Sequence, residues 1–556
     1  MRISKLSLTN FRSFRDTQTI DFAPVTLLFG PNSVGKSSVL MALVYLQGIL
    51  RSGQCNPQRL EVLGNKFVGG FENLVNGKDL SKSIVIRVDY DMPETVSGNT
   101  FDASQFFIDD IKQQENNSNP KDKRNLLCIS SPVEWANRMA VELEVKWSNS
   151  LQTAFVCRQA IWLDDEFVAE SINHDYTVNA QVHKVNYLHP LLKSDLEGEW
   201  FEHHRTDRDD NILGEFHDFI IQSATSTPKV IELPEVGNNQ LHTLFQYKSQ
   251  GGVLPTLGKV LMTSIEADDA LNTKRIEEVF SDIFVATLDN LKDILDSSLV
   301  IGPLRKIPDS TFDAEVTTKQ KDWYTGRASW DAISSCSIKQ ISDINSWLAT
   351  RQGLDLGFVL VEKNECGTKE YISTLFDRQN RSFADGQDDS LNVSLDNLVS
   401  QSSYQKKSMT LWDLHNEIEV TAADIGAGVS QVFPLVVAAT MNIKGLICCE
   451  QPELHVHPKS QVALGDLLTQ TDGVNNYLIE THSEHLILRL LRRIRETSNG
   501  ELEEGLSSVS IQDVSIVYLE STDNGVVARR TSLSEDGDLT EDWPQGFFEE
   551  RDGELF

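Results

Sequence analysis

The sequence has few basic residues for its length, and this shortage limits the partners that it can bind. Its 556 residues include 50 lysines and arginines against 82 aspartates and glutamates, which gives a net charge of −32 at pH 7. A surface of that sign repels phosphate backbones on average. We therefore expect no non-specific binding of nucleic acid by the whole surface, and any contact with nucleic acid is confined to a local basic groove.

Paired cysteines and long apolar runs are lacking as well. The seven cysteines show no C-x-x-C spacing, which predicts reduced thiols in a cytoplasmic protein. The N-terminal stretch MRISKLSLTNF lacks the apolar core of a signal peptide. The longest apolar stretch, at 432–449, is interrupted by Pro434, Asn442 and Lys444. Because a membrane span needs about 20 predominantly apolar residues, we expect no membrane contact.

What the sequence does contain is a phosphate-binding loop. Residues 28–38, LFGPNSVGKSS, match the pattern G-x-x-x-x-G-K-[ST] between an apolar strand and an apolar helix. Such a turn points backbone N–H groups and a helix N-terminus at phosphates, with the lysine on the β- and γ-phosphates and the serine hydroxyl on Mg²⁺. With ATP and Mg²⁺ as cofactors, the predicted binding residues are Gly30, Pro31, Asn32, Ser33, Val34, Gly35, Lys36, Ser37 and Ser38.

The segment before this loop gives a first resemblance. Alternating strands that carry N-F-R-S-F at 10–14, ahead of a phosphate loop, resemble the ATP-binding-cassette type of head found in SMC, RecF and OLD-like ATPases. In those proteins the segment lies beside the base and ribose, which implies a nucleotide-facing role for Arg12. A solvated strand position is an equally good interpretation of Arg12.

A second half of the site follows four hundred residues later. The sequence GLICCEQPELHVHP, at 445–458, is an apolar strand that ends in Glu450, as a Walker B strand does. A carboxylate there can hold Mg²⁺, so Glu450 joins Ser37 as a predicted metal-site residue. Gln451 stands where cassette ATPases usually carry the glutamate that activates water, and an amide can orient water without accepting its proton. Slow hydrolysis is the favoured interpretation; the alternatives are Glu453 as a substitute base and no hydrolysis.

Two further motifs complete this pattern. The sequence NNYLIETHSEHLILRLLRRI, at 475–494, predicts a strand followed by a helix, with His482 placed like the switch histidine of a cassette ATPase. The sequence DIGAGVSQ, at 424–431, opens an apolar helix with an anion-receptive N-terminus. In the cassette class such a signature loop contacts the ATP held by the other protomer of a head-to-tail dimer. The residues predicted for that contact are Gly426, Gly428, Ser430 and Gln431.

Together the motifs resemble one family. DIGAGVSQVFP, EQPELHVHP, ETHSEHLILRLLRRI, IGPLRKIPD at 301–309 and WPQGFFEE at 543–550 look like the AAA-labelled, OLD-like and SMC-like bacterial ATPases that end in a short domain of unknown function. The resemblance implies an α/β P-loop NTPase head of ABC/SMC type, with a mixed sheet and an antiparallel β lobe. It also implies ATP and Mg²⁺, a homodimer or higher oligomer and, in many relatives, defence against phage beside a separate effector.

The predicted function is therefore an ATP-gated dimerising switch that regulates an effector protein such as a nuclease. Its rivals are a self-sufficient nuclease, with 191–295 or the C-terminal region as the cutting part, and a non-hydrolysing ATP-bound scaffold. The sequence lacks room for the Toprim domain of OLD nucleases after His482, and it lacks the long heptad arms of SMC proteins.

Four units are predicted along the chain. The N-terminal part of the head with its antiparallel lobe covers 1–190, a helical arm is inserted at 191–295, the head resumes at 296–505, and a small C-terminal domain covers 506–556. The broad apolar face at 270–299 favours core packing over partner docking. Arg305, after a Gly-Pro turn, has three interpretations: contact with phosphate, contact with a neighbouring protomer, or a structural salt bridge.

Overall fold

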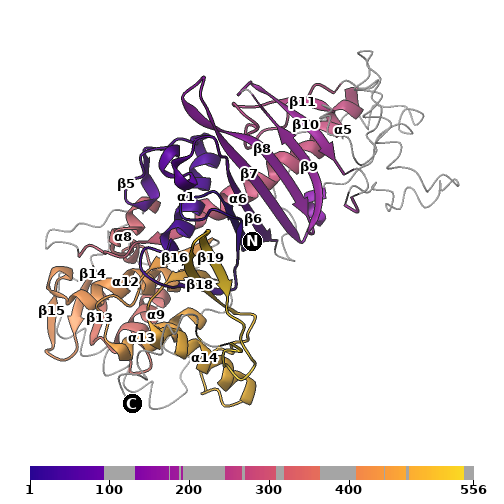
Figure 1. The fold of residues 1–556 in the computed structure, drawn as a ribbon. Coiled ribbons are helices and arrows are strands. Elements are labelled where there is room, and N and C mark those ends of the chain that lie inside the picture. Colours follow the sequence, from indigo (N-terminus) through magenta and orange to yellow (C-terminus); the bar gives the residue numbers. More distant parts are fainter. Residues whose placement is uncertain are drawn as a thin grey trace, which may run out of the picture.

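Two large β-sheets organise the molecule (Figure 1). The computed structural model describes residues 1–92, 132–174, 176–186, 189–191, 244–265, 270–307, 319–362, 409–441, 443, 445–470, 475–541 and 543. Within these ranges one sheet has eight strands and the other has six. The predicted combination of a mixed sheet with an antiparallel β lobe in an α/β head is confirmed.

The eight-stranded sheet is antiparallel and has the order β11-β10-β9-β8-β7-β6-β1-β2. Apolar residues alternate with polar ones along several of its strands, as expected for a sheet with one face on the core. Its strands are β1 (Arg2–Thr9), β2 (Gln18–Asp21), β6 (Ile84–Asp91), β7 (Arg138–Ser148), β8 (Thr153–Leu163), β9 (Glu166–Ile172), β10 (Asn179–Val185) and β11 (Phe245–Lys248).

The six-stranded sheet carries the nucleotide motifs. Its order is β12-β16-β17-β3-β18-β19, and every neighbouring pair is parallel except β18 with β19. All residues of β3 and β16 are buried, because helices cover both faces of a largely parallel sheet. Its strands are β12 (Leu299–Ile301), β16 (Leu446–Glu450), β17 (Asn476–Glu480), β3 (Val25–Phe29), β18 (Val514–Thr522) and β19 (Gly525–Arg530).

The mixed sheet divides the core into two large clusters, one between each of its faces and the helices that cover it. Leu28 of β3 belongs to the cluster shared with α1 and the antiparallel sheet, whereas Leu27 and Phe29 belong to the cluster under α12, α13 and α14. This split follows from the alternation of side chains along a strand. The helices of the head are α1 (Lys36–Ser52), α3 (Pro132–Trp135), α7 (Gln320–Trp323), α8 (Arg327–Ile333), α9 (Ile338–Ala349), α12 (Ala427–Thr440), α13 (Pro458–Thr469) and α14 (Glu484–Asn499).

Smaller elements surround this frame. A three-stranded sheet packs beside α9, and a short hairpin follows α1. No described helix is both long enough and apolar enough to span a bilayer. The remaining elements are β4 (Arg59–Leu60), β5 (Lys66–Phe67), β13 (Phe358–Glu362), β14 (Met409–Asp413), β15 (Ile418–Val420), η1 (Glu61–Leu63), η2 (Phe71–Asn73), η3 (Asn76–Lys78) and η6 (Ala422–Asp424).

The described part of the predicted helical insertion at 191–295 is largely helical, but it packs on the antiparallel sheet and does not stand apart as an arm. Strand β11 adds to the antiparallel sheet, and the continuous helix α5 (Ala270–Ser281), η5 (Asp282–Ala286) and α6 (Thr287–Ser297) runs along that sheet (Figure 1). Tyr90 donates from its hydroxyl to the carbonyl of Thr287 at 2.7 Å. The broad apolar face of this helix is therefore used for core packing, as favoured, because the sheet offers an apolar face of its own.

The C-terminal unit predicted at 506–556 joins the mixed sheet through its described strands. Strand β18 pairs with β3 in parallel register, Val514 opposite Val25 and Tyr518 opposite Phe29. The C-terminal segment thus supplies one of the two strands that flank the phosphate-loop strand.

Candidate nucleotide-binding site

The phosphate loop connects β3 to α1 in a conformation that needs glycine at two positions. Gly30 has φ 137° and Gly35 has φ 117°, both in the region that favours glycine. A Cβ on Gly30 would lie 2.3 Å from the carbonyl oxygen of Leu519 in β18, and one on Gly35 would lie 2.2 Å from Ser13 Oγ. The first and sixth residues of the motif are therefore glycine because backbone and side chain approach them closely.

Lys36 curls over this loop. Its ammonium donates to the carbonyls of Gly30 and Pro31, both at 2.9 Å, and only 3% of the residue is exposed. Burial lowers the pKa of Lys36, while the neighbouring carboxylates of Glu480 and Glu453 act in the opposite direction. The Lys36 ammonium thus lies over the loop, and the backbone N–H groups of that loop would bind phosphates, as the motif predicts.

Two carboxylates face the Ser37 hydroxyl at the carboxyl edge of the mixed sheet. Glu450 ends β16 and Glu480 ends β17, and the two are paired in register. Ser37 Oγ donates to Glu480 Oε2 at 2.9 Å. Burial, followed by the charge of Glu480, raises the pKa of Glu450 to about 7, and burial also raises the pKa of Glu480. Two carboxylates and a hydroxyl form the oxygen-donor set that Mg²⁺ prefers.

Glu480 is the site residue that sequence reasoning missed. The sequence pattern predicts Glu450 alone as the metal-side carboxylate, yet β17 lies between the Walker B strand β16 and the phosphate-loop strand β3. Its terminal carboxylate is the one that bonds Ser37. The signal was available in the sequence, because E-T-H at 480–482 ends a second apolar strand in an acid.

The three residues predicted for water activation lie on the turns that follow these strands. Gln451 has φ 48° and donates its backbone N–H to the carbonyl of Glu480 at 2.7 Å. Glu453 Oε1 accepts from the backbone N–H of His482 at 2.7 Å, and burial raises the pKa of Glu453. Burial, then Lys36, lowers the pKa of His482, which keeps its imidazole neutral near pH 7.

The signature segment opens α12, as predicted, but two of its side chains turn inward. Gly426 caps the helix and is exposed together with Ala427. Ser430 Oγ donates to the carbonyl of Ala427 at 2.8 Å, and Ser430 and Gln431 are 1% and 6% exposed. Both side chains are buried in this conformation, and their predicted contact with another protomer's ATP stays a prediction. The exposed backbone at the helix N-terminus is what a partner could contact.

Arg305 holds the signature helix against the Walker B strand. Its guanidinium donates to the carbonyls of Gln431 at 2.7 Å and of Glu450 at 2.6 Å, and the residue is 5% exposed. The three interpretations from the sequence are therefore corrected, because the partners are buried backbone carbonyls of this chain. A Cβ on Gly428 would lie 2.9 Å from the carbonyl oxygen of His455, which shows how closely the same two segments approach.

Arg12 lies in the turn after β1, with φ 51°, and not on a strand. Its guanidinium donates to the sulfur of Met41 in α1 at 3.0 Å, so the structure places it against the helix. The neighbouring Ser13 faces the loop instead. Ser13, residues 31–34 and part of the β18–β19 hairpin line a cavity of about 270 Å³. Within the described structure Ser13 Oγ is buried without a hydrogen-bond partner, which suits contact with a ligand.

Comparisons with known proteins agree with this geometry. The profile of the AAA ATPase domain family matches residues 1–224 and 329–487, and the profile of a protein family of unknown function (DUF3696) matches 509–556. The DNA replication and repair protein RecF of Desulforamulus reducens is 42% identical over 45 residues, 8% of this chain and 12% of RecF. The chromosome partition protein Smc of Synechocystis sp. is 36% identical over 69 residues, 12% of this chain and 6% of Smc. The matched segments are thus a small part of either relative.

Two solved structures are also similar. The SMC head domain from Thermotoga maritima matches 96% of this chain and 100% of its own at 9% identity, with a TM-score of 0.34. The Smc head domain bound to the C-terminal domain of ScpA, derived from Pyrococcus furiosus, matches 96% of each chain at 8% identity, with a TM-score of 0.35.

The AAA ATPase domain profile covers more than half of the chain and includes its phosphate loop, Walker B strand and signature helix. These elements stand at one edge of a mixed sheet beside an antiparallel lobe. The chain therefore belongs to the AAA ATPase domain family.

Proposed function

We propose that this protein is an ATP- and Mg²⁺-dependent ATPase that works as a nucleotide-gated dimerising switch. The observation that carries the proposal is the hydrogen bond between Ser37 and the buried carboxylate of Glu480, which stands in register with Glu450. Lys36 would contact the phosphates, and Ser37, Glu450 and Glu480 would hold Mg²⁺. The metal would neutralise charge on the phosphates when bound.

Hydrolysis is proposed to be slow. Gln451 offers an amide where a carboxylate would accept the proton of the attacking water, so it orients water without removing the proton. Glu453, whose pKa is raised by burial, lies next to His482 and is the alternative candidate for the base. A neutral His482 can donate to a phosphate oxygen or accept from the attacking water.

Dimerisation is proposed from the exposed N-terminus of α12. The backbone at Gly426 and Ala427 is exposed, and a helix N-terminus attracts an anion. The N-terminus of α12 in one protomer would contact the nucleotide that the phosphate loop of the other protomer holds. ATP would thus join the two heads. The sequence motifs that resemble defence ATPases support an effector protein, such as a nuclease, as the recipient of this closure.

A scaffold that binds ATP without hydrolysing it is the second candidate, and Gln451 is the observation that favours it. A self-sufficient nuclease is less well supported, because the net charge of −32 opposes nucleic-acid binding. The His- and Asp-rich segment 201–211, which that alternative would use, lies outside the described residues.

Phosphate release and oligomeric state test these proposals together. Wild-type protein would be assayed with ATP and Mg²⁺, with Lys36→Ala as the blank and Lys82→Ala as a matched control at an exposed lysine. Turnover above the blank, with an ATP-dependent dimer in light scattering, is expected. An ATP-dependent dimer without turnover would identify the scaffold. The absence of both turnover and an ATP-dependent dimer would overturn the proposed switch.

A further inference from the structure

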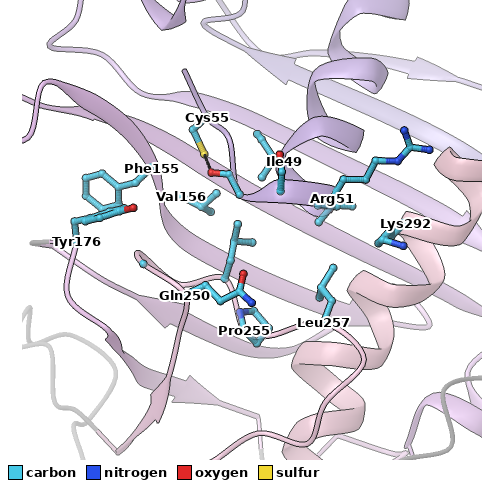
Figure 2. A pocket seen from close by; sticks show the side chains of 15 residues that line it. Ile49, Arg51, Cys55, Phe155, Val156, Tyr176, Gln250, Pro255, Leu257 and Lys292 are labelled. Carbon is cyan, nitrogen blue, oxygen red and sulfur yellow. Dashed lines mark hydrogen bonds between the residues drawn. The ribbon is translucent and has the colours of Figure 1, made fainter. Parts of the chain in front are cut away.

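A cavity of about 320 Å³ lies at the opposite end of α1 from the phosphate loop (Figure 2). The last turn of α1, strand β8, the segment 250–257 and helix α6 line it. Since α1 has 17 residues, the cavity stands about 25 Å along the helix axis from Lys36. The cavity is therefore separate from the nucleotide site and joined to it by one helix.

The cavity has a buried floor and an exposed rim. Cys55 and Val156 on the floor are 2% and 1% exposed, whereas Tyr176 on the rim is 40% exposed. A Cβ on Gly252, which has φ 70°, would lie 2.2 Å from the carbonyl oxygen of Val156, so the segment 250–257 packs tightly against β8. The volume has room for about ten water molecules and is typical of the smaller ligand pockets.

The charged side chains that line the cavity are both cationic. Arg51 Nε lies 2.6 Å from Asp296 Oδ1, and Lys292 Nζ lies 3.0 Å from Asp296 Oδ2. Asp296 is shared between the two cations, and Asp289, one helical turn before Lys292, interacts with the same ammonium group. Arg51 and Lys292 are the cationic side chains that the acidic group of a ligand would meet at this wall.

Aromatic rings form the other end. Phe155 and Tyr176 pack edge to face with their ring centroids 5.3 Å apart. Figure 2 shows these two rings on one side and Arg51 and Lys292 on the other, with the Gln250 side chain between them. A ligand that fits this arrangement has a planar ring at one end, hydrogen-bonding groups in the middle and an acidic group at the other end.

We propose that this cavity binds a nucleoside monophosphate as an effector of the ATPase. The base would stack on Tyr176, the sugar hydroxyls would meet Gln250, and the phosphate would lie between Arg51 and Lys292. Gln47 of α1 donates to the carbonyl of Leu295 in α6 at 2.8 Å, so the two helices that line the cavity are already joined. Binding does not depend on the proposed ATPase function, whereas an effect on turnover rests on it.

Calorimetric titration of AMP and of GMP into the full-length Lys36→Ala protein tests the binding. Both nucleotides lack the β- and γ-phosphates that Lys36 would contact, so the phosphate loop contributes little. We expect one saturable site per chain for at least one of them, with a Kd of about 1–100 μM. Tyr176→Ala and Lys292→Gln should each weaken binding about tenfold or more, and Lys248→Gln, at an exposed lysine of β11 outside the cavity, should not.

Saturation by neither nucleotide at about 1 mM would overturn the proposal, and so would binding that survives both cavity variants in proteins with wild-type melting temperatures. Inorganic phosphate that binds as tightly as the nucleotides would overturn the role of the aromatic rings. In wild-type protein that hydrolyses ATP, saturating nucleoside monophosphate should change phosphate release about twofold or more, and Tyr176→Ala should abolish the change. If the wild-type protein shows no turnover at all, that result contradicts the ATPase proposal, whereas the binding of the nucleoside monophosphate is still tested by calorimetry.

Discussion

Ser37 Oγ donates a hydrogen bond to Glu480 Oε2 at 2.9 Å across 443 positions of the sequence. The contact joins the first turn of α1 to the end of β17, and so it couples the phosphate loop to the acid pair.

Lys36→Ala should weaken ATP binding about 100-fold or more, because the variant removes the ammonium group that stands over the phosphate loop. Fluorescence titration with a labelled ATP analogue would measure the affinity. Lys82→Ala is the control, since Lys82 is an exposed lysine that pairs only weakly with Asp79. Normal affinity in Lys36→Ala would show that nucleotide binds elsewhere.

Glu480→Gln should remove most of the Mg²⁺ dependence of ATP binding and should also stabilise the metal-free protein. Burial raises the pKa of both Glu480 and Glu450, and the charge of Glu480 raises that of Glu450 further. Two ionised carboxylates side by side therefore destabilise the metal-free fold. We expect the free energy of unfolding at neutral pH to rise by about 1 kcal/mol. Urea denaturation would measure it, and a loss of stability would contradict this account of the acid pair.

Gln451→Glu should speed ATP turnover about tenfold or more if proton removal from water limits the rate. The new carboxylate would stand where the backbone already turns toward Glu480. Single-turnover phosphate release is the measurement, because it separates chemistry from product release. An unchanged rate, together with a loss of turnover in Glu453→Gln, would assign the base to Glu453.

Mg²⁺ affinity should fall as the pH falls below about 7, because Glu450 must lose its proton to bind the metal. The free energy of unfolding of the metal-free protein changes with pH in the opposite direction: it rises as the pH falls. A carboxyl group whose pKa rises on folding holds its proton more tightly in the folded chain, so its contribution is greatest below its ordinary pKa of 4.5 and is lost as the pH rises through about 7. Mg²⁺ titrations and melting curves between about pH 4 and pH 8 would measure both effects, with Glu450→Gln as the reference that lacks this carboxyl group.

Arg305→Met should destabilise the protein by about 1–3 kcal/mol, because it strips buried carbonyls of Gln431 and Glu450 of their donor. Arg305→Lys should recover part of the loss, since one ammonium can reach fewer carbonyls than a guanidinium fork. Urea denaturation would compare the three proteins. Equal stability of Arg305→Met and wild type would show that the tie between α12 and β16 is energetically neutral.

Local patterns predicted the parts of the site that lie within one stretch of sequence. The phosphate loop, the strand that ends in Glu450 and the helix that begins after Gly426 each rest on glycine spacing or a buried apolar run, and the structure contains all three. The antiparallel lobe followed from alternation for the same reason.

The remaining parts depend on strand order and on contacts between distant segments. Glu480 gains its position because β17 lies between β16 and β3, and no periodicity encodes that order. Arg305 meets Gln431 across 126 positions, and burial of Gln431 follows from that contact. Strands β11 and β18 were assigned to other units because short strands join sheets through pairing partners that lie far away in sequence.

The position of β3 between β17 and β18 also has a consequence for synthesis on the ribosome. The phosphate-loop strand leaves the exit tunnel early, and its two partners follow more than four hundred residues later. At ordinary translation speeds about 20–100 s therefore pass between the synthesis of the phosphate loop and that of the two strands that pair with β3. A message broken between the codons for Glu480 and Val514 would yield a chain with β17 but no β18, whose β3 is left as an unpaired apolar edge prone to aggregation.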